Sequence, residues 1–245
     1  MRTLHTEEPL AVAVVEVIQQ GDVRALKRLL DENPGLASAR LGDDDPDGMS
    51  RTLLHAVTDW PGHFPNGAAT VAALVSAGAD VDARFRGPHS ETPLHWAASN
   101  NDVEVLDALI DAGANIEGDG AVIGGGTPLA DARAFGQWRT AHRLVERGAE
   151  TTLADAATLG LIGRVESYFD GTSPSQEDVD RAFWGACHGG QQFCAQYLLD
   201  RGAKLNWIPP WEELTPLDAA QRSNAGALVR WLRDLDAESA RELSS

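Results

Sequence analysis

The sequence predicts an all-α solenoid built from about seven helix–turn–helix units. One observation is a recurring segment: Thr92-Pro93-Leu94-His95 is followed by Gly113-Ala114, and Thr127-Pro128-Leu129 is followed by Gly148-Ala149. The step from the threonine to the glycine is 21 residues in both copies. A second observation is that Gly78, Gly113 and Gly148 are each 35 residues apart. A fixed period in this range is typical of stacked repeats.

Each unit carries the signals of two short helices. Thr92 can cap the free N–H groups of a first helix, and Pro93 is tolerated in its first turn. The second helix has an apolar stripe at helical spacing, and Gly113 ends it because glycine accepts a left-handed conformation. The stripe consists of Val103, Leu106, Leu109 and Ile110. One such unit cannot bury its apolar face alone, so the units must stack.

Looser copies of the segment extend toward both ends of the chain. Thr52-Leu53-Leu54-His55 precedes Gly78, Thr215-Pro216-Leu217 opens the last copy, and Arg181–Trp184 keeps the step of 21 to Gly202. These residues resemble the ankyrin repeat family, whose signature is T-P-L-H-x-A. The resemblance implies a single ankyrin-repeat domain over 1–245, with extended finger loops between its units. The units are expected at 8–39, 49–83, 89–118, 124–151, 152–171, 178–207 and 212–235, with a polar tail at 236–245.

The composition favours a folded protein of a reducing compartment. An apolar fraction of 43% is too high for a disordered chain, and no apolar run approaches the ~20 residues of a membrane helix. The apolar run 9–15 lacks the basic start of a signal peptide, so we assign it to the first helix. Cys187 and Cys194 are the only cysteines, and both fall where the repeat places small buried residues. They predict a cytoplasmic location without disulfides.

The charged residues indicate which partners to expect and which kind of organism encodes the protein. The net charge is −17, from 37 acidic and 20 basic residues, and such a charge repels phosphate backbones. We therefore expect no nucleic-acid partner, and the lack of a long apolar run predicts no membrane. Apart from Lys27 and Lys204, every basic residue is an arginine, which indicates a GC-rich bacterial genome.

The family resemblance implies binding through the concave side, which is made of finger tips and exposed faces of the first helices. The finger at 84–91 is about two residues longer than the usual ankyrin spacing. Phe85 stands between Arg84 and Arg86 at its tip, and a lone aromatic residue there is typical of an interface anchor. The alternative is that Phe85 folds back on its own repeat.

Aromatic and acidic residues recur on the same side. Trp96 and Asp131 occupy the same repeat position on adjacent first helices, one residue after the slot of the motif histidine. A later finger carries Trp207, Trp211 and Glu212. Together they predict a groove suited to a cationic or basic partner.

Other aromatic residues are expected to be structural. Trp184 and Trp231 are predicted to fill gaps between irregular repeats. The resemblance implies that His55 and His95, in the motif slot, form hydrogen bonds within and between units. His89 and His188 lie outside that slot and, with Asp131, are the weak catalytic candidates.

Two loops could be mistaken for ligand sites, and one segment is an insertion. The glycine-rich finger 118–126 lacks the Lys-Ser or Lys-Thr of a phosphate-binding loop, and 43–48 lacks the closing glutamate of a calcium loop because Leu54 stands there. No cofactor and no metal are therefore expected. The insertion 60–66 lies at the turn between the two helices of the second unit, where it could cover a groove end or provide a second contact surface.

The sequence therefore predicts a protein-binding scaffold or adaptor that uses its acidic, Trp-rich concave face. The central contacts are expected at Phe85, Trp96, Asp131 and Trp207, with Arg84, Arg86, Trp211 and Glu212 around them. The alternative is a small-molecule-binding protein or an enzyme that uses a pocket in the same groove. No H-E-x-x-H or G-x-S-x-G motif is present, so an enzyme is the less favoured hypothesis.

Overall fold

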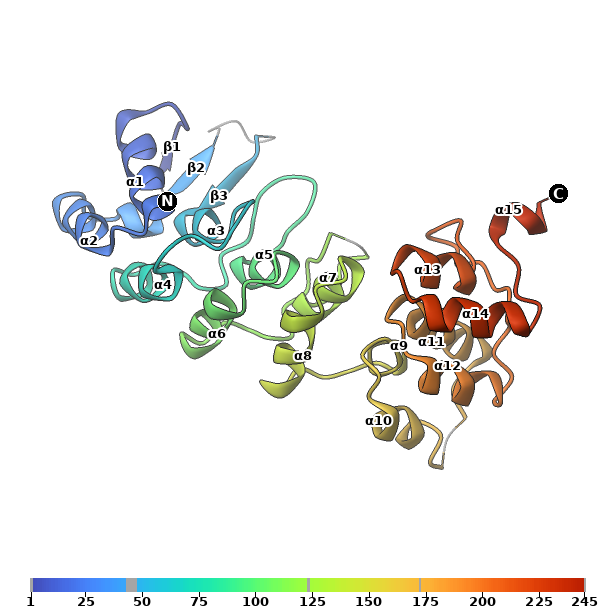
Figure 1. Cartoon of the computed structure of the whole chain (residues 1–245). Coiled ribbons are helices and arrows are strands. Elements are labelled where there is room, and N and C mark those ends of the chain that lie inside the picture. Colours follow the sequence, from blue (N-terminus) through green and yellow to red (C-terminus); the bar gives the residue numbers. More distant parts are fainter. Residues whose placement is uncertain (1, 43–47, 123, 172, 245) are drawn as a thin grey trace. The chain divides into compact units, whose positions relative to one another are not determined.

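The computed structural model describes residues 2–42, 48–122, 124–171 and 173–244 (Figure 1). The chain divides into two compact units, Met1–Ala149 and Glu150–Ser245, where the sequence predicted one continuous domain. Both units consist of helix–turn–helix repeats, as expected.

The first compact unit contains four repeats. Their first helices are α1 (Pro9–Gln20), α3 (Leu53–Val57), α5 (Pro93–Ser99) and α7 (Pro128–Ala134). Their second helices are α2 (Val23–Glu32), α4 (Gly67–Ser76), α6 (Val103–Asp111) and α8 (Trp138–Glu146). Each first helix packs against the first helix of the next repeat, and each second helix against the next second helix (Figure 1). Two residues of the predicted stripe of α6, Leu106 and Leu109, are fully buried, and the valine buried with them is Val105, whereas Val103 and Ile110 are half-buried.

The second compact unit contains the remaining helices. They are α9 (Leu153–Thr158), α10 (Ile162–Ser167), α11 (Gln176–His188), α12 (Gln192–Leu199), α13 (Pro216–Arg222), α14 (Gly226–Asp234) and α15 (Ala240–Leu243). The pair α9 and α10 lies within the expected short fifth unit at 152–171, and α11 packs between α9 and α13. α11 begins two residues before the expected unit at 178, because Ser175 caps it in place of the missing Thr-Pro pair.

The helix starts follow the predicted chemistry. Thr92 and Thr52 each form a capping box with the histidine three residues later, and Thr152 and Thr215 do so with an aspartate. The histidine or aspartate side chain accepts a hydrogen bond from the threonine N–H, which has no partner within the helix. Gly113 ends its repeat with φ of +95°, in the left-handed region expected for it.

A small sheet in the first unit departs from the all-α prediction. β1 (Thr3–Leu4) is parallel to β2 (Arg40–Gly42), and β2 is antiparallel to β3 (Ser50–Thr52). The strands are too short to show an alternating pattern. The side chain of Arg40 is buried and donates to Ser50 and to the carbonyl of Arg84, so one guanidinium ties the sheet to the next finger. The 3₁₀ helix η1 (Leu36–Ser38) precedes β2.

The core of the second unit contains the expected structural residues. Phe183 is fully buried, Trp184 is 5% exposed and Trp231 packs against the same cluster. Cys187 and Cys194 are free thiols in that core, and burial raises the pKa of both. These placements confirm the gap-filling role of the tryptophans and the small-residue role of the cysteines.

The residues predicted as a polar tail are partly structured. Ser239 and Glu242 form a capping box that starts α15, and the N–H of Ala240 donates to a carboxylate oxygen of Asp218 at 2.8 Å. Arg233 of α14 pairs with Glu242 at 2.9 Å. The described end of the chain is therefore attached to the last repeat.

Candidate functional site

The motif histidines hold the repeats together. Nδ1 of His95 lies 2.9 Å from Oγ1 of Thr92, and Nε2 donates to the carbonyl of Gly126 at 3.2 Å. His55 makes the equivalent bonds, with Nε2 3.1 Å from the carbonyl of Glu91. Burial lowers the pKa of His55 to about 3 and that of His95 to about 4, so both rings are neutral. The structural role expected for these residues is confirmed.

Trp96 lies between two other rings in the first unit. Its centroid is 4.9 Å from that of His55 in an edge-on arrangement and 5.6 Å from that of Phe85. The indole also donates a hydrogen bond to the carboxyl of Glu91. Phe85 is half-buried, because one side of its ring covers Trp96. The finger therefore folds back on the repeat, as the alternative hypothesis for Phe85 stated.

Asp131 is buried in the same unit. It is 1% exposed, and neither carboxylate oxygen has a hydrogen-bond partner among the described residues. Burial raises the pKa of Asp131 to about 7, and the negative charge of Glu91 adds to the shift, while the nearby amide of Val122 opposes it. Burial also raises the pKa of Glu91, which is 6% exposed. The carboxyl of Glu91 thus accepts from Trp96 and lies near enough to Asp131 for its charge to act there.

The two fingers above these carboxyls are bound to each other. Arg84 pairs with Asp119 and donates to the carbonyl of Ser90 at 3.1 Å. Gly120 has φ of +119°, and a Cβ atom there would lie 2.5 Å from the carbonyl oxygen of Ser90. Only glycine therefore allows this close approach. The sequence predicted that Arg84 contacts a partner at the rim of the binding face. In the structure Arg84 instead joins the two fingers to each other.

A hollow lies at the finger tips of the first unit. It has a volume of about 560 Å³ and is lined by Gly48, Met49, Phe85, Arg86, Gly87, Pro88, His89 and Ser90. Met49, one of the apolar lining residues, is 58% exposed. Backbone hydrogen bonds of 2.9 Å in both directions between Ser50 and Arg86 hold the two tips together. We call this feature the finger-tip hollow.

An aromatic cluster lies in the second unit. The ring centroid of Trp211 is 6.1 Å from that of Trp184 and 5.7 Å from that of Trp207. The guanidinium of Arg181 stacks on Trp211 at 4.3 Å. Trp184 donates through Nε1 to the carbonyl of Leu214 at 2.9 Å, whereas Trp211 is 43% exposed. A cation of the chain itself therefore already lies on Trp211, one of the rings that were expected to receive a cationic partner.

Glu212 and His188 belong to the same cluster. Glu212 pairs with Arg222, whose guanidinium lies 5.6 Å from the centre of the Trp184 ring. His188 is mostly buried, and its Nδ1 lies 3.2 Å from the hydroxyl of Ser223. Both side chains are engaged by residues of their own unit.

The expected site residues therefore form two groups. Arg84, Phe85, Arg86, His89, Trp96 and Asp131 lie in the first unit, and Trp207, Trp211, Glu212 and His188 lie in the second. Met49 and Glu91 were missed. The position of Glu91 directly before Thr92 was a usable signal, since a residue next to the cap is held beside the following repeat. Met49 carried no signal, because only the folded finger places it beside Phe85.

The insertion 60–66 forms a well-anchored loop in the first unit. Nε2 of His63 lies 2.9 Å from the carbonyl oxygen of Asn100, and the side chain of Asn66 donates to the carbonyl of Gly21. Trp60 is 82% exposed and lines a hollow of about 370 Å³ together with Phe135. Its role as a second contact surface stays a prediction.

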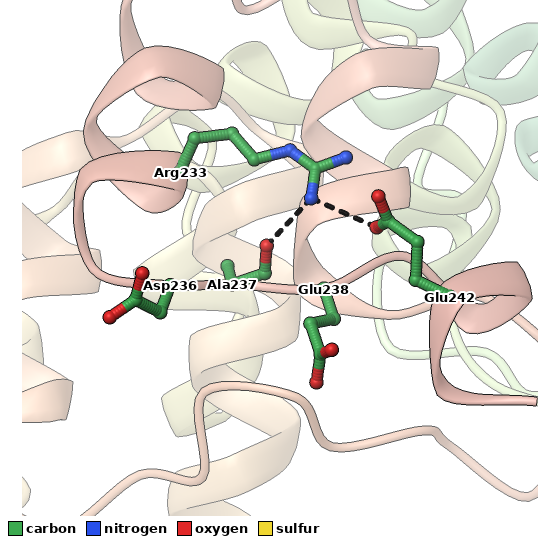
Figure 2. A pocket seen from close by; sticks show the side chains of 5 residues that line it. All are labelled: Arg233, Asp236, Ala237, Glu238 and Glu242. Carbon is green, nitrogen blue, oxygen red and sulfur yellow. Dashed lines mark hydrogen bonds and ion pairs between the residues drawn. The ribbon is translucent and has the colours of Figure 1, made fainter. Parts of the chain in front are cut away.

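Another hollow lies at the C-terminal end of the described chain. Its charged side chains already bind one another, so we do not choose it as the leading site. Its volume is about 510 Å³, and Figure 2 shows Arg233 bonded both to the carbonyl of Ala237 and to Glu242. These bonds, with those from Ser239, lower the pKa of Glu242 to about 2. Asp236 and Glu238 point away from Arg233 (Figure 2).

Other kinds of site have little support in the described part of the chain. It contains no group of three or more His, Cys, Asp or Glu side chains arranged to hold a metal ion. It also contains no helix both long and apolar enough to cross a bilayer. The acidic segment 43–47, considered as a calcium loop, lies outside the described residues.

Comparisons with known proteins agree with the repeat geometry. A family model for ankyrin repeats in three copies matches residues 63–155. The solved ankyrin repeat domain of human ASB11 has a similar fold, with a TM-score of 0.52 and 20% identity. The match covers 89% of this chain and 96% of that domain.

The chain contains ankyrin repeats, and its fold is an ankyrin-repeat solenoid.

One curated relative is similar in sequence to part of the chain. Over 73 residues, 30% of the chain, it is 40% identical to the palmitoyltransferase AKR1 of Candida albicans. The matched segment spans 8% of that transferase. The similarity therefore concerns only a small part of that transferase.

Proposed function

We propose that this protein is a scaffold or adaptor that binds a protein partner through the finger-tip hollow of its first unit. Ankyrin repeats generally serve as protein-interaction scaffolds. The observation that carries the proposal is the hollow between Met49 and Phe85, where exposed apolar surface is flanked by Arg86 and His89. An apolar centre with a polar rim is the usual anatomy of a protein interface.

The rigidity of the two fingers supports this role. The backbone bonds between Ser50 and Arg86 and the pairing of Arg84 with Asp119 hold the tips in place before a partner arrives. A preformed surface avoids the entropy cost of ordering loops on binding. Phe85 presents only part of its ring, because the rest covers Trp96.

The exposed aromatic residues of the second unit extend the proposal. Trp211 and Ile208 are 43% and 40% exposed on one finger, and Trp207 and Glu212 lie beside them. We assign this finger a secondary contact role. Arg181 already lies over the Trp211 ring, and Arg222 lies over the neighbouring Trp184 ring, so an apolar or acidic segment fits this finger better than a cationic one.

Affinity capture from the lysate of the native host tests the proposal. The full chain is compared with Met49→Ser/His89→Ser, which alters only exposed side chains of the hollow, and with Phe193→Ser, a control at a site that is 88% exposed. We expect one protein to be retained by the wild type and by the control and lost with the double variant. Equal retention by all three would exclude the hollow, and retention of no protein would contradict the scaffold function.

A further inference from the structure

The second helices of the first two repeats leave a hollow between them. α2 and α4 lie side by side in the first unit (Figure 1), and the hollow along them has a volume of about 460 Å³. α2 lines it with Val23, Lys27, Leu30 and Asp31, whereas α4 and the residue after it contribute only alanine and serine side chains. From the first to the last of the α2 residues the hollow extends over about two helical turns, or about 12 Å.

The equivalent gap between α6 and α8 is bridged by ion pairs. Arg143 of α8 pairs with Asp107 of α6 at 2.9 Å, and Arg147 at the end of α8 pairs with Asp107 at 2.7 Å and with Asp111. α4 cannot form such a bridge, because Gly67–Ser76 contains no charged residue. A helix at the surface of a protein usually carries charged or polar side chains on its outer face, so the exposed alanines of α4 indicate contact with another surface.

The exposed face of α2 carries five charges. Arg24, Lys27 and Arg28 lie in the first two turns, and Asp31 and Glu32 lie in the last. None of these five side chains forms an ion pair or a hydrogen bond with another described residue. The helix dipole favours acids at the N-terminal end and bases at the C-terminal end, which is the opposite arrangement. These charges therefore do not stabilise α2 itself.

A helix face that is basic at one end and acidic at the other is complementary to a copy of itself. In an antiparallel pair of α2 helices, related by a two-fold axis near the middle of the helix, Lys27 and Arg28 of each copy lie opposite Asp31 and Glu32 of the other. Each acidic end then lies beside the positive end of the opposing helix, where the dipole favours it. One surface can thus satisfy all four charges twice.

The net charge of the chain limits where two copies can meet. At −17 per copy, most pairs of surfaces repel each other. α2 carries three basic and two acidic residues and α4 carries none, so this face has no excess of negative charge. The small side chains of α4 allow close approach, and the half-buried Val23 and Leu30 provide apolar surface to cover.

We infer that two copies of this protein associate through the face formed by α2 and α4, with the two α2 helices antiparallel. The inference goes beyond the proposed function, because it uses another surface than the finger-tip hollow and its occupant is a second copy of the chain. One helix face and one hollow make a small interface, which is typical of weak and reversible association. The dimer carries two finger-tip hollows, which raises its avidity for a partner with two binding segments.

Sedimentation equilibrium of the full chain tests the inference. The measurement is made at about 150 mM salt, where the Debye length of about 8 Å screens the general repulsion between copies. We expect a reversible monomer–dimer equilibrium with a Kd on the order of 10–100 µM. The variant Met49→Ser/His89→Ser, altered at the finger tips, should dimerise like the wild type, so this inference and the proposed function can fail separately.

Two charge reversals test the antiparallel arrangement. Lys27→Glu/Arg28→Glu and Asp31→Lys/Glu32→Lys should each raise the Kd by about tenfold or more, because like charges then face each other. An equimolar mixture of the two variants should dimerise again, since one α2 face is now mainly acidic and the other basic. All four positions are exposed, and circular dichroism confirms that both variants are folded.

A control separates this effect from the change in net charge. Arg139→Glu/Arg230→Glu alters the net charge as much as Lys27→Glu/Arg28→Glu does, at exposed positions of α8 and α14, and should change the Kd by no more than about twofold.

Three outcomes would overturn the inference. They are a chain that stays monomeric at about 200 µM, a dimer whose Kd is unchanged in both α2 variants, and a mixture of the variants that forms no dimer. A monomeric chain that captures another protein only when Lys27 and Arg28 are present would also overturn it and would assign this face to that protein.

Discussion

The imidazole of His55 meets the indole of Trp96 edge-on, with the ring centroids 4.9 Å apart and the planes at 78°. His55 belongs to the capping box of α3, and Trp96 belongs to the first helix of the next repeat. The residue expected to contact a partner is therefore also part of the packing between repeats. Any effect of a Trp96 substitution on partner binding must therefore be distinguished from its effect on folding stability.

Trp96→Ala is expected to destabilise the first unit. The substitution removes the ring contacts with His55 and Phe85 and the hydrogen bond to Glu91, so it should lower the free energy of unfolding by about 2–3 kcal/mol. Urea denaturation followed by circular dichroism measures this. Trp60→Ala, at a side chain that is 82% exposed, is the matched control and should change stability by less than about 0.5 kcal/mol. Equal effects of the two would contradict the packing role.

Asp131→Asn is expected to stabilise the protein in a pH-dependent way. The folded pKa is about 7 and the ordinary value is 3.8, so the folded state binds more protons between these values and the wild type loses stability as pH rises. The asparagine of the variant does not titrate, so the variant does not lose this stability as the pH rises. Near pH 8 it should be more stable than the wild type by a few kcal/mol, and near pH 4 the difference should be small. A pH-independent difference in urea midpoints would show that Asp131 is not protonated in the fold.

The motif histidines should make the first unit sensitive to acid. His55 and His95 have folded pKa values of about 3 and 4, below the ordinary 6.5, so the unfolded state binds more protons in this range. Their contribution to stability is complete above about pH 6.5 and is lost as pH falls toward the folded values. This is measured in the Asp131→Asn variant, where the opposing carboxyl is absent. The urea midpoint of unfolding should decrease as the pH is lowered below 6.5. Replacing the exposed His142 by glutamine should leave this slope unchanged.

The two tryptophans of the second unit should differ in their energetic roles. Trp184→Ala removes a side chain that is 5% exposed and bonded to the carbonyl of Leu214, and should cost about 3–5 kcal/mol. Trp211→Ala removes a half-exposed ring stacked with Arg181 and should cost about 1 kcal/mol. Thermal unfolding of both variants separates the core residue from the surface residue. A larger decrease in stability for Trp211→Ala than for Trp184→Ala would contradict this assignment and show that the finger of Trp211 supports the fold.

The sequence predicted the parts of this fold whose causes are local. Thr92, Pro93 and Gly113 set the ends of helices through caps, a fixed φ and a left-handed conformation, and each was readable in its own segment. The capping box of Ser239 with Glu242 followed the same S-x-x-E pattern and could have been recognised in the presumed tail.

The parts that were missed depend on contacts between distant segments. The proximity of Glu91 and Asp131 arises because the fingers fold down on the next repeat, and no pattern within either segment specifies that. The same is true of Arg84, whose charge suggested a rim contact but which pairs with Asp119 of the following finger. Charge and aromatic content identified the relevant residues, whereas burial determined what each of them can do.

The affinity of the captured partner for the Met49→Ser/His89→Ser variant tests the central claim most directly. The wild type and the folded variant are titrated with the purified partner by calorimetry, with Phe193→Ser as the control. The account predicts binding weaker by at least about tenfold, or about 1.4 kcal/mol, for the variant at the finger-tip hollow and unchanged binding for the control. Unchanged affinity of the finger-tip variant would contradict the claim that this hollow binds the partner.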